Sequence, residues 1–399
     1  MAKDITVIRQ KVDDIFDKVV EIRRHIHMDP ELGEHEEKTA AYISSKLSEI
    51  GIDCKTGIAG HGVIGTIYGK DKTRAAAIRA DIDALPVTET VDTPYKSKIP
   101  GVMHACGHDV HTAMLLGAAM VLKSMESELP ASIRLLFQPS EETIGGAERM
   151  IQEGCLKDPD VSSVIGFHVD PSQPAGKIRM LDGPMNAASC EFNVSVFGKS
   201  SHGAHPDKGV DALLPACTMV TSLQSIITRR MDPADPCLIT VGTFHSGTKE
   251  NIISGQADFN GIIRTFSLEN RDFIKSEIVK VCENTAAAFS AACDVRFSDS
   301  YPSLENNHEL YCLIKDVAED ALGSENVVTG GLPSLGADDF AYFCHGTRGM
   351  YLDLGSAFPG EESYPLHSDK FCPDEECMKT GILIEVLSVL KILEEESEK

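Results

Sequence analysis

The sequence predicts an α/β protein with a second, differently built region inside it. Through the first half of the chain, apolar strand-like runs alternate with amphipathic helical segments, which is typical of a sheet covered by helices on both faces. From about residue 184, strand-like runs alternate apolar with polar residues, which indicates a sheet with one solvated face. At 399 residues the chain is also too long for one compact core, so it suits two or three domains, or one domain with a large insertion.

The first elements are two helices followed by short strands. Apolar residues recur at helical spacing from Ile8 to Ile22, and this pattern stops at Asp29-Pro30. A second helical pattern follows, before a strand that is expected over 63–68. The run 75–83 has the pattern of a buried strand, and it ends in two carboxylates.

Further along, strands and helices continue to alternate. A helix is expected over 114–125, then a strand over 133–137, another helix, and a strand over 164–169. Polar side chains recur where these strands end. In an open α/β sheet the edge formed by the strand ends is where ligands bind, so we expect these polar residues to meet there.

The inserted region has six elements. They are a strand near 190–196, a helix over 210–220, strands over 238–244 and 257–264, a helix over 271–289 and a strand at 295–297. The order βαββαβ suits a ferredoxin-like sandwich. We therefore expect residues 184–297 to be a domain inserted into a discontinuous domain made of 1–183 and 298–399.

The charge of the chain argues against several classes of partner. The sequence has 37 basic and 61 acidic residues, a net charge of −24. A negative field of this size repels phosphate backbones and anionic lipid, so we expect neither nucleic-acid nor membrane binding. The N-terminus lacks the pattern of a signal peptide, and the 12 cysteines are scattered without CxxC pairs. These features predict reduced thiols in a cytoplasmic protein.

The stretch 103–111 holds three histidines, a cysteine and an aspartate directly ahead of an apolar run. Cys106 and His108 are separated by one glycine, so both side chains can face one centre, and a thiolate with an imidazole suits a divalent transition metal. His104 and His111 are expected to be structural or to support the ligands. The alternatives are a loop with incidental polar residues at a helix start, or a Cys-His hydrolase, for which the sequence shows no oriented base.

Two pairs of carboxylates follow predicted strands. Because Glu141 and Glu142 are adjacent on extended backbone, their side chains diverge, so one can bind a metal while the other acts on a water. An exposed acidic loop is the alternative. Asp81 and Asp83 are two apart on one face and could bind metal or accept a hydrogen bond from a ligating histidine.

Single polar residues elsewhere are candidates of less specific pattern. His168 ends an apolar strand and His367 follows Tyr-Pro-Leu, where a histidine is more often structural. His202 lies on a loop of small residues in the inserted region. Arg264 ends a strand and could bind a carboxylate in bidentate fashion, although a surface arginine is the more frequent case.

Together these motifs resemble the M20 metallopeptidase/aminoacylase family. The resemblance is to its amidohydrolase branch, which includes hippurate hydrolases, auxin-conjugate (IAA-amino acid) hydrolases and N-acetyl-diaminopimelate deacetylases. It covers nearly the whole chain. The matching segments, in order, are Arg24 with 29–33, then 79–86, 103–109, 138–142, 167–168, 198–202, 334–340 and 366–368.

The resemblance implies a zinc-peptidase-like catalytic domain, three-layered with a mixed sheet, and an inserted ferredoxin-like domain that serves as lid and dimerisation surface. It implies two divalent metal ions, Zn or Mn with Ni or Co as alternatives. The implied metal ligands are Cys106, His108, Glu142, His168 and His367. Asp81 stands where peptidase relatives have a metal-binding histidine, so it is left out of this set.

The remaining roles also come from the resemblance. Glu141 matches the general base and Asp83 the carboxylate that orients the site. His202 would stabilise the oxyanion, and Arg264 with Asn251 would hold the substrate carboxylate. The thiol of Cys106, where peptidase relatives use a carboxylate, points to the amidohydrolase branch.

Three departures from the family pattern concern substrate preference more than the metal centre. Serines occupy positions 200 and 201, where two glycines are usual. Asn251-Ile-Ile-Ser replaces the usual Asn-Val-Ile-Pro, and Asp338 replaces the more typical glutamate.

The expected function is that of a metal-dependent amidohydrolase that cleaves N-acyl amino acids, as a homodimer or higher oligomer formed through the inserted domain. The alternative within the family is a dipeptidase or carboxypeptidase. A catalytically silent metal- or metabolite-binding protein is a different class, and the presence of Glu141 argues against it.

Overall fold

The computed structural model describes residues 2–361 and 363–398, and contacts divide this chain into two compact units. The first unit is made of the segments up to Met185, Glu305–Leu332 and from Asp339 onward. The second is made of Asn186–Leu304 and Pro333–Asp338. The domain boundaries expected at 183/184 and 297/298 remain predictions.

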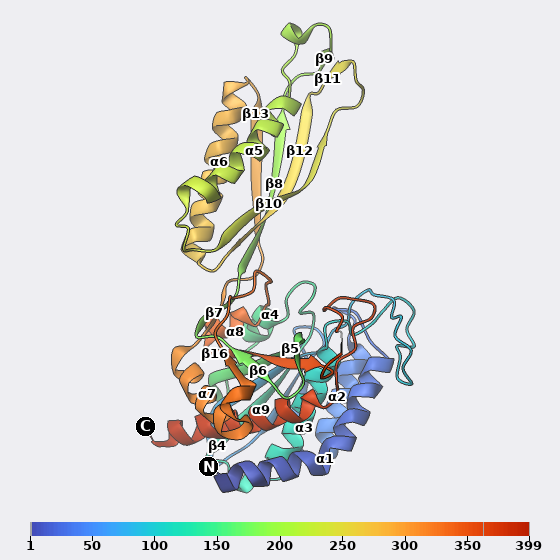
Figure 1. The fold of residues 1–399 in the computed structure, drawn as a ribbon, viewed down its shortest axis with the longest axis vertical. Helices are drawn as coiled ribbons and strands as arrows, with labels where there is room; N and C mark the ends of the chain where they lie inside the picture. Colours follow the sequence, from blue (N-terminus) through green and yellow to red (C-terminus); the bar gives the residue numbers. More distant parts are fainter. Residues whose placement is uncertain (1, 362, 399) are drawn as a thin grey trace. The chain divides into compact units, whose positions relative to one another are not determined.

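The first unit is built on a mixed sheet of eight strands, in the order β1-β2-β4-β3-β5-β16-β6-β15 (Figure 1). Its central strands β4, β3, β5 and β16 run parallel. Strand β2 pairs antiparallel with both β1 and β4, and β6 pairs antiparallel with β16 and parallel with β15. The strands are β1 (Asp53–Ile58), β2 (Gly62–Ile67), β3 (Asp71–Asp81), β4 (Ala131–Gln138), β5 (Asp160–Pro174), β6 (Ile178–Met180), β15 (Val327–Thr329) and β16 (Arg348–Ala357). Two short strands, β7 (Gly183–Asn186) and β14 (Leu304–Asn306), lie where the chain passes between the units.

Helices cover this sheet. They are α1 (Ala2–Met28), α2 (Glu37–Glu49), α3 (His108–Lys123), α4 (Ala147–Gln152), α7 (His308–Leu322), α8 (Ala341–Gly346) and α9 (Cys377–Glu398). Helix α1 buries Ile8, Val12, Val19 and Ile22, the residues whose spacing predicted it. Helix α3 contacts α1 and α9 as well as the sheet, and because it is enclosed in this way most of its side chains are buried.

The side chains of β16 alternate between the two faces of the sheet. Met350, Leu352 and Leu354 belong to the large core that α1, α3 and α9 share. Tyr351 points the other way and stacks on Phe340, which directly precedes α8. Both faces of the sheet are therefore covered, as the buried strands predicted, and the fold is a mixed α/β sheet with helices.

The parallel strands bring the predicted polar residues to one level of the sheet. Asp81, the last residue of β3, pairs with Gln138, the last residue of β4. On the other side of β3, Arg79 pairs with Gly166 of β5, and β5 then continues through His168. The strand ends that carry Asp81, Gln138 and His168 are thus neighbours.

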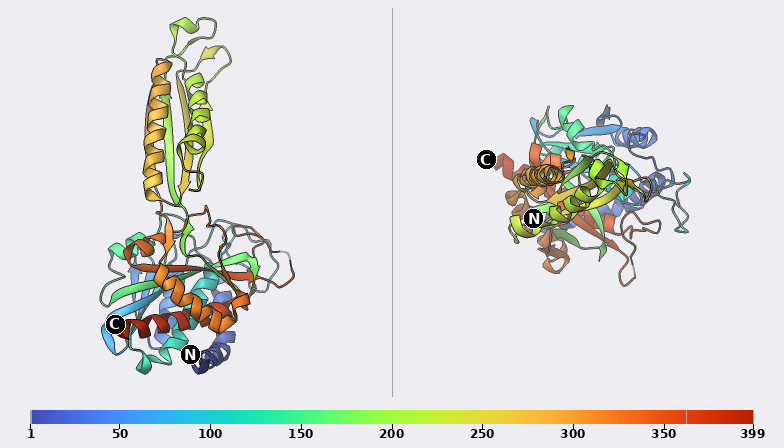
Figure 2. Two further views of the ribbon diagram at one scale, coloured as in Figure 1. Left: turned by 60° about the vertical axis from the view of Figure 1, so that its left-hand side comes forward. Right: turned by 90° about the horizontal axis from the view of Figure 1, so that it is seen from above.

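The second unit is a four-stranded antiparallel sheet with two helices. Its elements, in chain order, are β8 (Ala188–Phe197), α5 (Leu213–Arg230), β10 (Cys237–Ser246), β12 (Gln256–Thr265), α6 (Leu268–Ala288) and β13 (Ala292–Asp299). The strand order β10-β12-β8-β13 and the βαββαβ succession are those of a ferredoxin-like sandwich. Both helices lie on one side of the sheet (Figure 2), where they share a core with residues such as Phe192, Met219 and Ile274.

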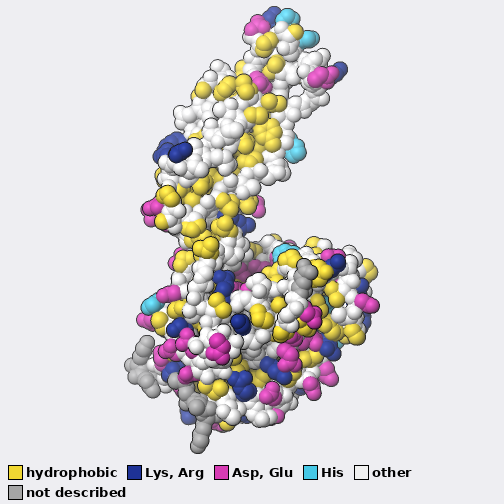
Figure 3. All heavy atoms as spheres, in the orientation of Figure 1, with side chains coloured by type: hydrophobic (Ala, Val, Ile, Leu, Met, Phe, Trp, Pro, Cys, Tyr) yellow, Lys and Arg dark blue, Asp and Glu magenta, His cyan; other side chains and the backbone are white. Residues whose placement is uncertain are grey.

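The rest of the second unit consists of loops and a small hairpin. Strands β9 (Ser201–His202) and β11 (Ile252–Ile253) pair with each other antiparallel. On the face shown in Figure 3, hydrophobic side chains are interspersed with polar ones over this unit. Its large exposed hydrophobic residues include Phe197, Leu213, Leu214, Phe244, Ile252, Phe289 and Leu335.

Among residues 2–361 and 363–398, no helix combines the length and the apolar composition needed to cross a membrane. Short 3₁₀ turns complete the fold at Glu126–Glu128, Pro206–Lys208 and Ser324–Asn326.

Candidate metal centre

Cys106 lies at the centre of a cluster of metal-ligand side chains. Its Sγ atom is 3.3 Å from Nε2 of His168 and 3.3 Å from Nε2 of His367. Ligand atoms of Cys106, His108 and His168 lie within 4.8 Å of one another, and so do those of Cys106, Glu142 and His367. The cluster is therefore two sets of three donors that share one thiol.

The backbone around Cys106 explains why the two ligands of the nine-residue stretch converge. Gly107 has φ +82°, and a Cβ atom there would lie 2.4 Å from Cγ2 of Val169, so the turn requires glycine. His108 then begins α3. His367 also has a left-handed backbone, with φ +63°, and its N–H donates to the carbonyl of Ala105 at 2.9 Å. This bond holds a candidate ligand from the C-terminal segment beside the turn.

Asp83 orients His108. Nδ1 of His108 is 2.9 Å from the carbonyl oxygen of Asp83 and 3.2 Å from its Oδ1. A proton on Nδ1 satisfies both contacts and leaves the lone pair on Nε2, which is buried and has no hydrogen-bond partner among the described residues. The sequence left two possible roles for Asp83, as a metal ligand or as a hydrogen-bond acceptor from a histidine, and the structure shows a contact of the second kind.

The carboxylate of Asp81 contacts a guanidinium group and an imidazole ring. Its Oδ2 accepts from Nη1 of Arg79 at 2.6 Å, and its Oδ1 is 2.7 Å from Nδ1 of His111. Burial opposes ionisation, but the electrostatic interactions with His108, Arg79 and His111 lower the pKa of Asp81 well below its usual value. Asp81 and His111 form another donor group with His108, but both Asp81 oxygens already have partners.

His111 bridges Asp81 to the backbone of β5. Its Nε2 accepts from the N–H of Val169 at 3.0 Å, so both ring nitrogens are used. Burial, the largest cause, lowers the pKa of His111 to about 4 despite the nearby carboxylate. His111 is therefore neutral near pH 7, with the Nδ1 proton facing Asp81, which agrees with the supporting role expected for it.

Glu141 and Glu142 diverge. Oε1 of Glu142 is 3.1 Å from Nε2 of His367, and its N–H donates to Oδ2 of Asp83 at 3.0 Å. Burial would raise the pKa of Glu142, but the hydrogen bond from His367 and the charge of His108 lower it to about 2. Glu141 is also buried, and one of its oxygens lies in a group with His108 and Glu142. The exposed acidic loop is thereby excluded.

The donors fit a pair of divalent transition-metal ions. The set combines a thiol, imidazole nitrogens and carboxylate oxygens, which is the mixture that Zn²⁺ and similar ions bind. Burial raises the pKa of the Cys106 thiol well above its usual value, so a nearby cation is needed to hold it as the thiolate. Nε2 of His108, which has no hydrogen-bond partner among the described residues, is available to bind a metal ion together with Cys106 and His168.

Three predicted site residues lie in the second unit. The hairpin β9–β11 pairs His202 with Ile252 and brings Asn251 beside it, where the carbonyl of Asn251 accepts from Gly203 N–H at 2.7 Å. Arg264 lies on β12 and is half-buried. Its Nη1 is buried without a hydrogen-bond partner among the described residues, and burial lowers its pKa.

A network of buried charged side chains that joins α1 to α3 was not predicted from the sequence. Arg23 is fully buried on α1, and its Nε donates to Oδ2 of Asp109 at 2.6 Å. Nδ1 of His27 is 2.8 Å from the same oxygen. The available signal was position, because Arg23 lies four residues after Val19 on the apolar face of its helix. A charge on that face indicates a buried partner.

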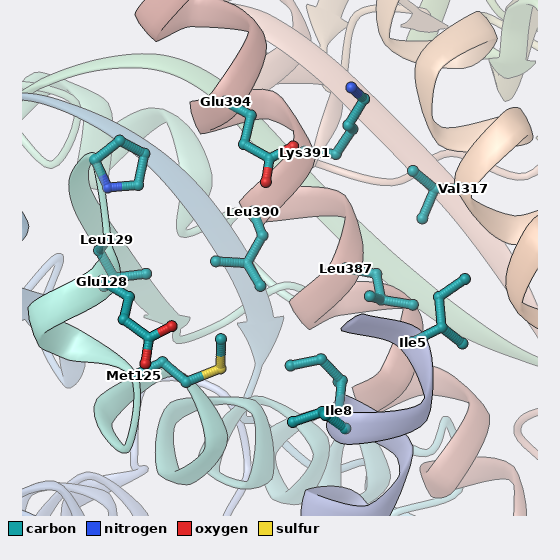
Figure 4. A pocket seen from close by; sticks show the side chains of 12 residues that line it. Ile5, Ile8, Met125, Glu128, Leu129, Val317, Leu387, Leu390, Lys391 and Glu394 are labelled. Carbon is teal, nitrogen blue, oxygen red and sulfur yellow. The ribbon is translucent and has the colours of Figure 1, made fainter. Parts of the chain in front are cut away.

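A separate cavity of about 430 Å³ lies in the first unit, between the start of α1, the segment after α3 and the second half of α9 (Figure 4). Apolar side chains such as Ile8, Leu129 and Leu387 line most of it, and Lys391 and Glu394 of α9 border it. The ligand cluster around Cys106 uses other residues, so this cavity is no part of the candidate metal centre.

Several known proteins are similar to this chain in sequence and in fold. The chain is 38% identical over 389 residues to thermostable carboxypeptidase 2 of Saccharolobus solfataricus, covering 96% of this chain and 98% of the relative. It is 37% identical over 358 residues to N-acetyl-L-cysteine deacetylase of Bacillus subtilis, covering 90% and 84%. A solved B. subtilis structure, described as a dinuclear metal-binding peptidase of the M20 family, superposes with a TM-score of 0.83 at 30% identity and covers 96% and 99%.

The profile of one protein family extends over most of the chain as well. It matches residues 77–390, which include every residue of the two donor sets. The chain belongs to peptidase family M20/M25/M40.

Proposed function

We propose that the protein is a metal-dependent amidohydrolase that hydrolyses N-acetyl- or aroyl-amino acids to a carboxylic acid and a free amino acid. The observation that carries this proposal is the pair of donor sets sharing the Cys106 thiol, with the separate carboxylate of Glu141 beside them. A relative named as a deacetylase, 37% identical over 358 residues, supports the amide of an N-acyl amino acid as the bond that is cleaved.

The proposed ligands are Cys106, His108, Glu142, His168 and His367. Two divalent ions bound there, Zn or Mn with Ni or Co as alternatives, would supply a water of lowered pKa and polarise the amide carbonyl. Asp83 would keep the ligand geometry, because it contacts both Nδ1 of His108 and the N–H of Glu142.

Glu141 is the proposed general base. It would take one proton from the attacking water while the water oxygen bonds to the amide carbon. It would then pass this proton to the amide nitrogen as the carbon–nitrogen bond breaks, which releases the amine and leaves the acid. The burial of Glu141 supports this role, because a carboxylate shielded from bulk solvent transfers its proton to the substrate rather than to water.

The second unit would contribute substrate recognition. Arg264 has a buried guanidinium nitrogen without a partner among the described residues, and a substrate carboxylate would satisfy it. Asn251 would assist by donating from its side-chain amide. His202 is exposed on its hairpin and would donate to the oxygen that becomes negative during the attack.

A dipeptidase or carboxypeptidase activity is the second candidate. It is favoured by the relative named as a carboxypeptidase, which is 38% identical over 389 residues. The two candidates differ in the acyl side of the bond, which is a simple acid in one and an amino acid or peptide in the other. A protein that binds metal without catalysis is the third case.

A substrate panel separates these candidates. Protein loaded with Mn²⁺ or Zn²⁺ is incubated with acetyl-, benzoyl- and longer acyl-amino acids and with dipeptides, and released amine is measured. We expect release from N-acyl amino acids and a loss of about a thousandfold or more in kcat for Glu141→Gln, with bound metal unchanged. Activity confined to dipeptides would favour the second candidate, and full activity of Glu141→Gln would contradict the mechanism.

We further propose a homodimer or higher oligomer formed through the second unit. Its support is the exposed edge strand β10, which ends the four-stranded sheet, together with exposed hydrophobic residues such as Phe244 and Leu214. Light scattering on the purified protein measures the mass directly, and a monomer at micromolar concentration would contradict the proposal.

A reducing, cytoplasmic location is also proposed. All 12 cysteines are free thiols, and several of them are buried. Free-thiol quantification of protein purified without reductant tests this, since disulfides in freshly isolated protein would contradict it.

A further inference from the structure

The turn that carries Glu141 and Glu142 has a strained backbone. Ser140, directly before them, has φ +58°, and Glu34, which contacts it, has φ +69°. Residues with a Cβ atom rarely adopt this left-handed conformation, because the Cβ approaches the following carbonyl oxygen. Such backbone persists only when its surroundings hold it.

The carboxylate of Glu36 provides this hold. Its Oε1 accepts from the N–H of Ser140 at 2.7 Å and from the Ser140 hydroxyl at 3.1 Å. The same hydroxyl oxygen accepts from the N–H of Glu34 at 2.9 Å. The Glu36 side chain is fully buried, and these bonds replace the hydration of Oε1. Its Oε2 is buried without a hydrogen-bond partner among the described residues.

The usual reason for a carboxylate at this position does not apply to Glu36. It is the N-cap residue of α2, yet it makes no capping hydrogen bond to that helix. Glu31 serves the helix instead, because its Oε2 accepts from the N–H of Thr39 at 2.8 Å. The Glu36 side chain therefore bonds to the Ser140 turn rather than to its own helix.

The turn is held on its other side as well. The N–H of Glu142 donates to Oδ2 of Asp83 at 3.0 Å, and the carbonyl of Ser140 accepts from Gly145 N–H at 3.0 Å. Glu141 lies between Ser140, which Glu36 holds, and Glu142, which Asp83 holds. Its backbone, and with it the direction of its side chain, is determined by Glu36 before it and by Asp83 after it.

We propose that Glu36 is a positioning residue for the metal centre: through Ser140 it holds the turn so that Glu142 faces the donor cluster and Glu141 faces the substrate. The roles of Glu141 and Glu142 in this proposal rest on the proposed function. Loss of Glu36 would let the turn relax, so that ligand geometry is lost while the fold and the five proposed ligands remain.

The test is a Co²⁺ titration of metal-free protein, followed by the absorption of the Co²⁺–thiolate and Co²⁺ ligand-field bands. We expect Glu36→Ala to weaken Co²⁺ binding about tenfold to a hundredfold and to alter the ligand-field spectrum. Glu36→Gln should restore part of the affinity, because its amide oxygen can still accept from Ser140 N–H. Glu37→Gln is the matched control, since Glu37 is the exposed neighbour at the start of α2, and it should bind as wild type does.

Kinetics give a second readout that a purely structural role would not move. At saturating metal and well below the melting temperature, Glu36→Ala should lower kcat about tenfold with little change in KM. Wild-type Co²⁺ affinity, spectrum and kcat in Glu36→Ala would overturn the proposal even if its melting temperature fell. Should Glu36→Ala not fold, Ser140→Ala replaces it, because it removes the hydroxyl that joins Glu36 to Glu34.

These outcomes separate the inference from the function on which it rests. A wild-type protein that binds Co²⁺ through the thiol but cleaves no N-acyl amino acid contradicts the proposed function, and the titration still decides the role of Glu36. A fully active Glu36→Ala enzyme contradicts the inference and leaves the function intact.

Discussion

The two units hold their predicted site residues in different ways. In the first unit, Asp81, His111 and Asp83 are buried, and each has named partners on its polar atoms. In the second, His202 is exposed on a short hairpin and Arg264 leaves one guanidinium nitrogen without a partner among the described residues. The contrast indicates a metal centre that is organised before any ligand arrives, and recognition groups that a substrate would have to complete.

The strongest way to break this contrast is to remove the shared thiol. Cys106→Ala should abolish stable binding of both metal ions and lower kcat/KM at least a thousandfold, because both donor sets use this sulfur. Metal content by mass spectrometry and amide hydrolysis measure the two effects. Cys217→Ala, which changes an exposed thiol, is the control and should match wild type. Retention of two ions in Cys106→Ala would refute the shared-ligand arrangement.

Arg264 tests the part of the comparison that concerns the second unit. Arg264→Ala should lower kcat/KM for N-acyl amino acids about a hundredfold, because a charged hydrogen bond to the substrate carboxylate is lost. Metal content should stay the same, since Arg264 is absent from the described donor groups. Substrate amides that lack the carboxylate should show no such loss. Arg296→Ala, which changes an exposed arginine of β13, is the matched control. An equal loss of kcat/KM in Arg296→Ala would contradict a role of Arg264 in substrate binding.

His111 tests whether the candidate metal centre is held in place before a metal ion binds. His111→Ala removes the bridge between Asp81 and the N–H of Val169, so we expect metal affinity to fall about tenfold. Competition with a chromophoric chelator gives the affinity. The exposed His308, changed to Asn, should leave it as it is. Unchanged affinity in His111→Ala would mean that Asp81 needs no support from this side.

Glu385 is one of several buried residues of the first unit that have a polar atom without a partner among the described residues, and its replacement gives the smallest effect. It is buried in α9, its Oε2 has no partner among the described residues, and burial raises its pKa well above the usual value. Protonated in the folded state, it favours folding at acid pH, and this contribution is lost as pH rises from the unfolded pKa towards the folded one.

Glu385→Gln should therefore melt about 2–4 °C above wild type at pH 8 and show a smaller difference at pH 4.5. Differential scanning fluorimetry across that range is sufficient. The exposed Glu376, changed to Gln, should show no pH-dependent gain. A difference that is independent of pH would show that ionisation of Glu385 is not its cause.

Sequence patterns were sufficient for the elements and for residues whose chemistry is local. Apolar periodicity located α1 and the strands, and the spacing of Cys106 and His108 marked the metal cluster from within nine residues. The bond between Glu36 and Ser140 spans 104 residues, and the one between Arg23 and Asp109 spans 86. Such pairings depend on how the chain closes in three dimensions, and a single sequence gives no periodic signal for them.

The backbone bond from His367 to Ala105 has a consequence for synthesis of the chain. It fixes a proposed ligand that lies 261 residues after Cys106 in the sequence. The ribosome must therefore release nearly all of the first unit, and the whole of the second, before the donor set of Cys106, Glu142 and His367 can close. A nascent chain or a C-terminally truncated product can fold its early strands, but it lacks His367, one of the donors around the thiol, until this segment docks. Binding of a metal ion to the proposed set Cys106, Glu142 and His367 would thus be a late event in synthesis.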